Sequence, residues 1–365
     1  MLKPRILVTG ASGKTSRVVV AELLQAGYRV RAMVHRQDAR SAQLRAQGAE
    51  IAVGDMSDVA HVAEALKDVQ RAYHCPPFDP YMIHGAVAFA LAARESGLEH
   101  IVGLTQWLAS PSHPALMTRQ HWLVDRLLSM TPGITHTIVR PGFFADSYLA
   151  LTGPAAHLGV FPWPYGDSRN APPSNEDIAR VAVSALVNPS RHAGRTYRPT
   201  GPTLLGAQEM ASAIGRAVGR RVRVVPTPTW MFLKGMRMEG FPTDEIGAFR
   251  YYVDDHKRGA FEAGAPTTDV LEVTGRPAEE FETIARRYAA LPRNRRTLSN
   301  RVRAFADFLI TPLRPGPNLA RYDRELRRPV PSTPQFALES EVWRREHLES
   351  PARTTRIAEP REKLA

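Results

Sequence analysis

Cysteine is almost absent from this sequence, because Cys75 is the only one among 365 residues. A single cysteine excludes a disulfide within the chain and is typical of proteins in a reducing compartment. Long hydrophobic runs are absent too, since no stretch of about 18 residues is both apolar and uncharged. The first residues lead directly into a strand pattern and leave no room for a signal peptide. We therefore expect a cytoplasmic protein without a membrane span.

Lysine is also scarce, since the 48 basic residues include only six lysines. The net charge is +12, and residues 276–365 are especially rich in arginine. Acidic residues are interleaved with these arginines, however, and nothing resembles a DNA-binding arm or a zinc finger. His, Cys, Asp and Glu residues nowhere have the spacing of metal ligands. We therefore expect neither a nucleic-acid partner nor a bound metal.

Short β-branched runs alternate with stretches of helical period from residue 5 to residue 150. Strands are expected at residues 5–9, 29–34, 51–53, 71–74, 100–104 and 135–139, with helices between them. Strands that alternate with helices of about 10–15 residues form βαβ units, in which helices cover both faces of a parallel sheet. The sequence therefore predicts an α/β Rossmann fold with a doubly wound parallel sheet.

Three regions are expected along the chain. Residues 1–150 form the Rossmann domain, residues 151–290 a smaller α/β substrate lobe that could interleave with it, and residues 291–365 an Arg/Pro-rich C-terminal extension. The proline-containing residues 141–172 are expected to be loop-rich. The extension contains large apolar side chains that a disordered tail seldom carries. They are Phe305, Phe308, Leu309, Phe336 and Trp343. We expect them to anchor the extension on the globular body or on a second subunit of a homodimer.

A glycine turn, VTGASGKTS at residues 8–16, follows the first strand and opens the first helix. Gly10 permits the tight turn, and Gly13 lets backbone N–H groups approach a pyrophosphate at the positive end of the helix. Ser16 replaces the third glycine of the dinucleotide fingerprint and is small enough for close packing. A triphosphate-binding P-loop is excluded, because it requires a glycine where Val8 stands. The residues expected in this dinucleotide site are Gly10, Ser12, Gly13, Lys14 and Thr15.

The end of the second strand indicates which dinucleotide is bound. NAD-specific proteins often carry an acidic residue there, whereas this chain has His35 and Arg36, and Asp38 comes only two residues later. Arg36, with Lys14 nearby, could bind a 2′-phosphate as a forked donor, or could be a solvated arginine. Asp55 after the third strand could contact the adenine, cap the next helix, or do both. The sequence favours NADP(H) and leaves NAD(H) open.

Seven segments, taken in order, carry a family resemblance. They are TGASGKTS, RVRAMVHR, GDMSD, RPGFFADSYL, EDIARVAVSAL, GRTYRPTGP and DVLEVTGRPAEEFETIARRY. Together they resemble the NmrA-like family of atypical short-chain dehydrogenases, over residues 4–290. The resemblance implies an NAD(P)-binding Rossmann fold. The family includes NAD(P)H-dependent reductases of quinones, dyes and alkaloid precursors, and regulators that bind the cofactor without turning it over.

The proton donor of ordinary short-chain dehydrogenases is missing. Those enzymes use a Tyr-x-x-x-Lys pair, and none of the ten tyrosines here is followed four residues later by lysine. Several members of the family carry a histidine and an acidic residue four apart on the fifth helix, and His121 and Asp125 match that spacing. Residues four apart share a face of a helix, so Asp125 could orient His121. The alternative is an exposed histidine with a separate surface aspartate.

Ligands of doubly wound sheets bind at the carboxyl ends of the strands. Further cofactor contacts are therefore expected from Met56, Cys75, Pro76, Pro77, Thr105, Pro141 and Phe143. An apolar substrate pocket would be lined by Phe78, Trp107 and Phe144, although core packing would also explain each of them. Tyr81, His84 and Tyr148 are further proton-donor candidates.

Two functions fit these observations. The first is an NAD(P)H-dependent reductase of an apolar conjugated, carbonyl-bearing or imine-bearing small molecule. The cofactor then supplies the hydride, and no Tyr-x-x-x-Lys pair is needed. The second is a non-catalytic NAD(P) sensor that binds another protein, with the arginine-rich extension as its contact surface. The apolar lining favours the reductase, and the missing catalytic pair favours the sensor.

Overall fold

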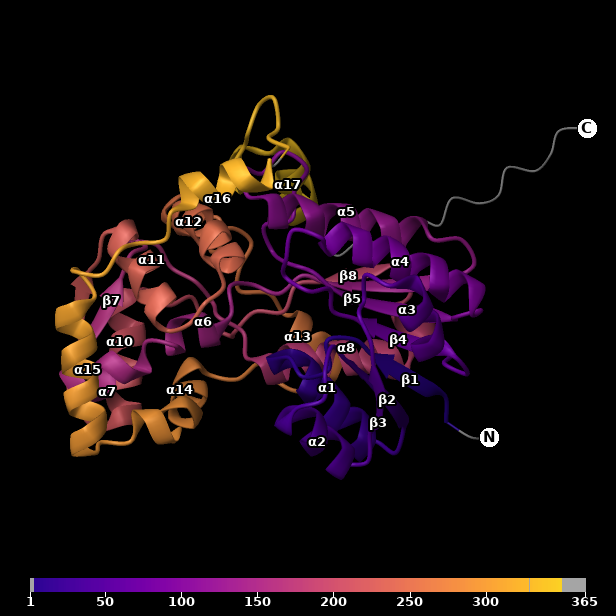
Figure 1. Ribbon diagram of the computed structural model, residues 1–365, viewed down its shortest axis with the longest axis horizontal. Helices are drawn as coiled ribbons and strands as arrows, with labels where there is room; N and C mark the ends of the chain where they lie inside the picture. Colours follow the sequence, from indigo (N-terminus) through magenta and orange to yellow (C-terminus); the bar gives the residue numbers. More distant parts are fainter. Residues whose placement is uncertain (1–2, 328, 350–365) are drawn as a thin grey trace, which may run out of the picture.

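The computed structural model describes residues 3–327 and 329–349. Seven strands form one sheet in the order β3–β2–β1–β4–β5–β6–β8 (Figure 1), and all neighbouring strands are parallel. The strands are β1 Arg5–Val8, β2 Arg29–Val34, β3 Glu50–Val53, β4 Arg71–His74, β5 His100–Leu104, β6 Thr135–Val139 and β8 Arg195–Tyr197. The strand order reverses at β1, which is the doubly wound arrangement. The predicted Rossmann fold is therefore confirmed.

Helices cover both faces of this sheet, which is why its strands are apolar on both sides. One layer contains α1 (Lys14–Gln25), α2 (Ala39–Ala46), α8 (Asn175–Val187) and α13 (Asp269–Thr274), and the short α9 (Pro189–His192) follows α8. The other layer contains α3 (Val59–Leu66), α4 (Met82–Glu95) and α5 (Leu116–Met130). Successive residues of β1 alternate between the layers: Ile6 and Val8 pack with the first, and Leu7 packs with the second.

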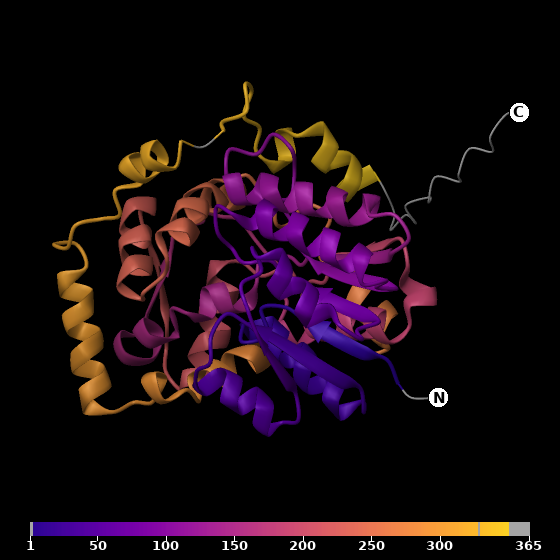
Figure 2. The ribbon, with the colours of Figure 1, turned by 45° about the vertical axis from the view of Figure 1, so that its right-hand side comes forward.

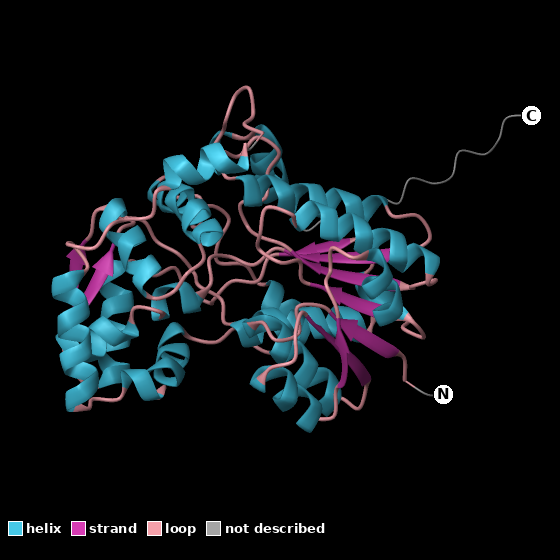
Figure 3. Cartoon of the chain, viewed as in Figure 1, coloured by secondary structure: helices cyan, strands magenta, loops and turns pink. Residues whose placement is uncertain are grey.

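A second lobe lies beside the sheet (Figure 2). It contains α6 (Ala145–Leu149), α7 (Thr152–Leu158), α10 (Ala207–Val218), α11 (Thr229–Met238), α12 (Thr243–Lys257) and α14 (Phe281–Ala289). Its parallel strands β7 (Val160–Trp163) and β9 (Arg223–Pro226) stand apart from the large sheet (Figure 3). Residues 141–172, expected to be loop-rich, also contain α6, α7 and β7. Pro154 falls in the first turn of α7, where no backbone N–H is needed, and Pro162 lies on a strand of a two-stranded sheet.

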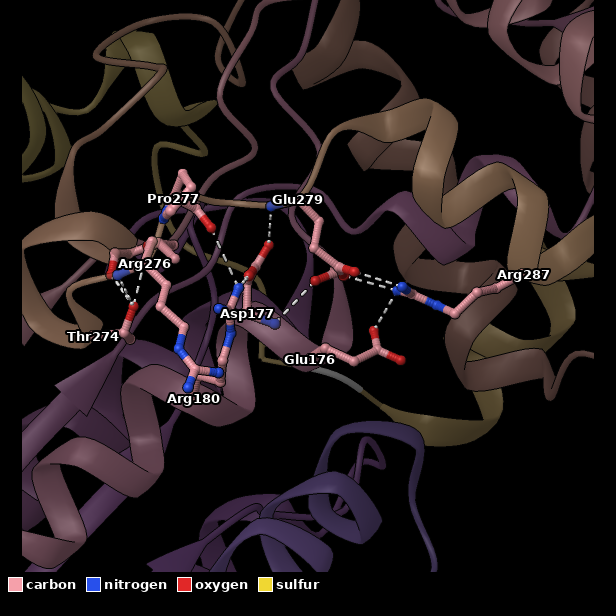
Figure 4. A network of polar contacts seen from close by, with 10 residues as sticks. Glu176, Asp177, Arg180, Thr274, Arg276, Pro277, Glu279 and Arg287 are labelled. Carbon is pink, nitrogen blue, oxygen red and sulfur yellow. Dashed lines mark hydrogen bonds and ion pairs between the residues drawn. The ribbon is translucent and has the colours of Figure 1, made fainter.

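The sheet domain and the second lobe interleave along the chain. Strand β8 and helices α8 and α13 follow residue 150 and yet complete the sheet domain; the predicted domain boundaries themselves stay a prediction. Figure 4 shows polar contacts where α8 meets α14. Arg287 on α14 donates to Glu176 on α8 at 2.8 Å, and Asp177 accepts a hydrogen bond from the Glu279 N–H at 2.8 Å. These contacts hold the second lobe against the sheet domain.

The C-terminal extension runs from the second lobe back to α5 around the outside of the molecule (Figures 1 and 2). It contains η1 (Pro292–Asn294), α15 (Leu298–Ile310), α16 (Leu319–Leu326), η2 (Ala337–Glu339), α17 (Glu341–Arg344) and η3 (Arg345–Glu349). We refer to residues 335–349 as the C-terminal strap. None of the helices in the described ranges is long and apolar enough to cross a membrane.

Some apolar side chains of the extension are buried, and others are exposed. Trp343 in the strap is fully buried, and its indole N–H donates to the Trp107 carbonyl at 2.8 Å. The expectation that Trp343 anchors the extension is therefore confirmed. Phe336 is half-buried and meets His113 edge-on at 5.8 Å between ring centroids. Phe305, Phe308 and Leu309 on α15 are each more than half exposed, so the expected anchoring on the body is wrong for these three.

Candidate functional site

Gly10 forms the turn between β1 and α1 with a φ of +55°, a left-handed value that favours glycine. A Cβ at this position would lie 3.2 Å from the carbonyl oxygen of Cys75. The buried hydroxyl of Thr9 accepts a hydrogen bond from the Cys75 N–H at 2.9 Å. The shape of this turn is therefore fixed by the end of β4 as well as by its own glycine.

Gly13 is the N-cap of α1, and no side chain caps this end of the helix. It is exposed, and a Cβ there would lie 3.1 Å from the Gly10 carbonyl oxygen. The first N–H groups of a helix lack intrahelical acceptors, and this end carries partial positive charge. The start of α1 can therefore receive an anionic group such as a pyrophosphate. Beside it, Ser12 is half-buried, and the Thr15 hydroxyl donates to Asn175 of α8 at 2.7 Å.

The end of β2 presents basic side chains to water. His35 and Arg36 are both exposed, and Arg36 has no ion pair within residues 3–327 and 329–349. The later acid, Asp38, caps α2 and pairs with Arg40. The expected neighbour Lys14 does not stand free beside Arg36, because its ammonium lies 2.6 Å from the Asp146 carboxylate of α6. Among the described residues, Arg36 rather than Lys14 is thus the side chain at this strand end without an ion pair.

The loops after β3 and β4 add backbone and small side chains. Asp55 is exposed, and the hydrogen bond that it accepts from the Ser57 N–H holds the pKa of its carboxyl below the usual value. The cap of α3 is Asp58 and not Asp55, so the capping alternative for Asp55 falls away. Met56 is half-buried over Gly85 of α4. Burial raises the pKa of the Cys75 thiol, which therefore stays protonated near neutral pH. Pro76 is buried, and Pro77 is half-buried.

Two buried histidines lie below these loops, between β4 and α5. Burial lowers the pKa of His74 and of His121 to about 3, so both rings are neutral at pH 7. The Phe78 ring lies 6.0 Å from the His121 ring, and Phe89 of α4 lies 4.4 Å from His74. Within the described part of the chain, neither nitrogen of His74 has a hydrogen-bond partner, and neither does Nδ1 of His121. Buried polar atoms without partners are places where a ligand can form hydrogen bonds.

Asp125 does not orient His121, contrary to expectation. Its carboxylate accepts a hydrogen bond from Nε of Arg140 at 2.7 Å, and both side chains are buried. Arg140 also donates to Glu346 of the strap at 2.6 Å, and Glu346 pairs with Arg126 as well. The four-residue spacing does place His121 and Asp125 on the buried side of α5. The charge of Arg140 draws the carboxylate away from the neutral imidazole.

Three predicted site residues belong to packed interiors. Trp107 is buried under the strap and donates its indole N–H to the Ala260 carbonyl at 2.8 Å. Phe143 lies in an aromatic cluster with Phe261 at 5.0 Å, and Tyr148 in the same cluster shares its hydroxyl with His256 and Asn170. These side chains stabilise the second lobe and the strap, so Tyr148 has no free hydroxyl to offer at the strand ends.

The remaining candidates lie around the strand ends. Thr105 directly follows β5 and Pro141 lies two residues after the end of β6; both are buried, and Phe144 is half-buried. Tyr81 is 70% exposed at the start of α4, and the His84 ring lies 3.2 Å from the Ser57 carbonyl oxygen. Among residues 3–327 and 329–349, no three His, Cys, Asp or Glu side chains gather in a way that could hold a metal.

Sequence reasoning missed three charged or polar members of this region: His74, Arg140 and Glu346. His74 and Arg140 have a signal in the sequence, since each stands at the carboxyl end of a predicted strand, next to candidates that were named. Glu346 has none, because 206 residues separate it from Arg140 along the chain.

The profile of the NmrA-like family matches residues 2–263. This chain belongs to the NmrA-like family. It is 31% identical over 290 residues to the NAD(P)H azoreductase of Xenophilus azovorans, covering 78% of this chain and 98% of the relative. Its fold is similar to that of the NADPH-dependent quinone oxidoreductase of Escherichia coli complexed with NADPH. That comparison has a TM-score of 0.67 and 21% identity, covering 77% of this chain and 98% of the other.

A negative transcriptional regulator has a similar fold. NmrA in complex with NAD has a TM-score of 0.66 and 17% identity, covering 78% of this chain and 95% of the regulator. At these identities the two structural comparisons establish the fold alone.

Proposed function

We propose that this protein binds NADP(H) at the carboxyl edge of its sheet and uses it to reduce a small-molecule substrate. The observation that carries the proposal is the uncapped start of α1 at Gly13, with the unpaired Arg36 at the next strand end. The similarity to an NAD(P)H azoreductase and to an NADPH-bound quinone oxidoreductase supports it. NAD(H) is the weaker ligand in this proposal.

The residues present fit the cofactor. A pyrophosphate requires free N–H groups in the first turn and no side chain at the helix start. Gly13 has no side chain and none caps α1, although the N–H of Gly13 itself donates to the Gly10 carbonyl at 2.8 Å. Arg36 would pair with the 2′-phosphate, while His35 and Asp55 would flank the adenosine. The neutral imidazoles of His74 and His121 would lie nearest the nicotinamide, where their unpartnered nitrogens could bind its amide or the substrate. These assignments rest on position, charge and burial.

The proposed reaction is a hydride transfer from the cofactor to the substrate, followed by protonation. When bound, the cofactor supplies a hydride. The protein orients the two reactants and keeps the region beside His121 and Phe78 apolar. With a pKa of about 3, His121 does not store a proton at neutral pH. The proton that accompanies the hydride therefore comes from water, which suits apolar conjugated, carbonyl or imine substrates that accept hydride at carbon. We place this activity in the cytoplasm.

The alternative is a sensor that binds NAD(P) without turnover and contacts another protein. The similarity of fold to NmrA favours it, and so do Asp125 and Tyr148, because both are engaged by other side chains and neither pairs with His121. A reductase consumes NADPH, and a sensor does not.

The discriminating experiment follows NADPH absorbance with a panel of quinones, azo dyes, enones and imines. The proposal requires substrate-dependent oxidation by the parent protein and its loss in a variant that no longer binds NADPH. If NADPH binds tightly and no member of the panel accelerates its oxidation, the sensor is favoured. If NADPH does not bind at all, both functions are rejected.

A further inference from the structure

Helix α15 presents an apolar face that no described residue covers. Its large apolar residues recur at three- and four-residue steps, which places them on one side of the helix and its C-terminal continuation. We call them the α15 face: Leu298, Val302, Phe305, Phe308, Leu309 and Leu313. Each keeps at least 54% of its surface exposed. Contiguous apolar patches of this kind are rare on proteins that contact nothing, and they mark interaction surfaces.

The helix is nevertheless packed against the second lobe. Ala304 and Ala306 are half-buried, and α15 packs along α7. The chain just after α15 is tied to α11, because Lys234 donates to the Pro312 carbonyl at 2.9 Å. Figure 2 shows α15 as the outermost element of the second lobe. The α15 face thus belongs to a helix that is attached to the second lobe, and its own side chains stay exposed.

Positive charge borders this face. Arg295 and Arg296 precede α15, and Arg314 follows Leu313. Arg301 lies on the same side of the helix as Phe305 and Phe308, four and seven residues before them. All four are exposed, and none has an ion pair within residues 3–327 and 329–349. Asp307 is the one acidic residue between positions 290 and 316.

An exposed tryptophan adjoins the end of the α15 face. Trp230 on α11 is 54% exposed, and the Lys234 ammonium lies 5.0 Å from its ring centroid. The same ammonium binds the Pro312 carbonyl, which brings Trp230 close to Leu313. Tryptophan with one apolar and one polar side is typical of side chains at the boundary between a bilayer and water.

We propose that the α15 face binds the surface of a bilayer that contains anionic phospholipids. An amphipathic helix with Phe and Leu on one side and arginines around it lies in the plane of such a surface. The lipid headgroups supply the negative charge that the unpaired arginines lack. A second copy of this chain fits the face less well, because a two-fold contact would bring the arginines of both copies together. The proposal concerns the extension and does not depend on the reductase function.

The test is flotation of the full-length protein with vesicles of phosphatidylcholine alone and of phosphatidylcholine mixed with phosphatidylglycerol. We expect binding to the mixed vesicles that weakens with added salt. Phe305→Asp should weaken partitioning roughly ten- to a hundredfold, the value of burying one phenylalanine. Arg296→Gln and Arg301→Gln should each weaken it about fivefold. Matched controls on α4 are Leu91→Asp and Arg94→Gln, which change exposed side chains far from α15 and should leave binding unchanged.

Light scattering of each variant over a dilution series, with its melting temperature and NADPH oxidation rate, separates loss of binding from loss of folding. The proposal is overturned by equal binding to neutral and anionic vesicles, or by unchanged binding of Phe305→Asp. It is also overturned if no vesicle binds. In that case a dimer that Phe305→Asp dissociates would assign the α15 face to a second copy.

Discussion

The carboxyl edge of the sheet is built in two different ways on either side of β1. On the side of β2 and β3 it is open, because Gly13, His35 and Arg36 are exposed. On the side of β4, β5 and β6 it is closed, because His74, Asp125 and Arg140 are buried and the strap covers Trp107. The first side can gain a charged ligand without rearrangement. The second side is already assembled by contacts within the chain.

Residues at the ends of the strands are therefore of two kinds: some are free to bind a ligand, and others stabilise the fold. The sequence pattern does not distinguish the two kinds. A substitution on the open side should change ligand affinity and leave stability nearly constant. A substitution in the network of Asp125, Arg140 and the strap on the closed side should change stability first, and activity only through it. Each prediction below places a residue on one side or the other.

The largest effect is expected from Trp343→Ala in the strap. Removing a fully buried indole leaves a cavity, and aromatic-to-alanine changes in cores cost about 3–5 kcal/mol. Phe305→Ala on the exposed α15 should change the free energy of unfolding by no more than about 0.5 kcal/mol. Urea denaturation of the two variants measures both numbers. Equal losses would mean that the strap and α15 are not packed as differently as described.

Arg36→Ala should lower the affinity for NADPH roughly ten- to a hundredfold, because a charge-assisted contact contributes about 1.5–3 kcal/mol. Its affinity for NADH should stay nearly constant, so the preference between the two cofactors collapses. Calorimetric titration with each cofactor gives the ratio. Arg40→Ala is the matched control, since that arginine is already paired with Asp38. An unchanged ratio in Arg36→Ala would contradict the assignment of the 2′-phosphate.

Glu346→Ala should destabilise the protein by about 1–3 kcal/mol, because it removes one of the two carboxylates that balance the buried Arg140. Glu346 is partly exposed, which keeps the effect below that of a fully buried pair. Glu349→Ala changes an exposed glutamate of the same segment and should leave stability within about 0.5 kcal/mol. If both variants melt like the parent, the strap does not contribute through this network.

The smallest expected effect is the pH dependence of stability contributed by a single buried histidine. His74 and His121 have pKa values lowered by burial from 6.5 to about 3 in the folded chain. The folded state therefore binds fewer protons than the unfolded state below pH 6.5. The contribution of these neutral histidines to the free energy of unfolding is fully present above pH 6.5 and is lost as the pH falls toward 3. Each should contribute on the order of 1–2 kcal/mol to the loss between pH 7 and pH 5.

The measurement is a pair of urea titrations at pH 7 and pH 5, for the parent and for His121→Gln. The variant should lose less stability between the two pH values than the parent does. His61→Gln, at an exposed position, is the control. A parent whose stability rises on acidification would show that these rings are not buried as neutral groups.

The sequence predicts the open side better than the closed side, for a physical reason. The turn at Gly10–Gly13 and the basic end of β2 depend on local backbone geometry and on residues adjacent in the chain, so spacing reveals them. Both His121 and Arg140 could be the hydrogen-bond partner of Asp125, and residue spacing does not predict which of the two it is. His121 is four residues away on the same helix, but Arg140 comes from β6 and Glu346 from the strap. The burial of Trp107, Phe143 and Tyr148 likewise depends on elements that are distant in the chain.

The same limit applies within the extension. The composition of the extension indicates that its apolar side chains are not all exposed to water. It does not indicate which of them pack against the sheet domain. Trp343 does, and Phe305 does not. The strap packs beside α5, where Trp343 covers Trp107 and Glu346 pairs with Arg140. These contacts join residues far apart in the chain, so the sequence pattern does not predict them.

The most direct test of the cofactor site is a calorimetric titration of NADPH into the parent and into Gly13→Val, with the melting temperature of both. The valine would place its side chain where a pyrophosphate meets the start of α1. We expect the parent to bind NADPH and the variant to show no detectable binding while it still melts cooperatively. If Gly13→Val binds NADPH as tightly as the parent does, the cofactor site does not lie at the start of α1, and the observation on which the proposed function rests is contradicted.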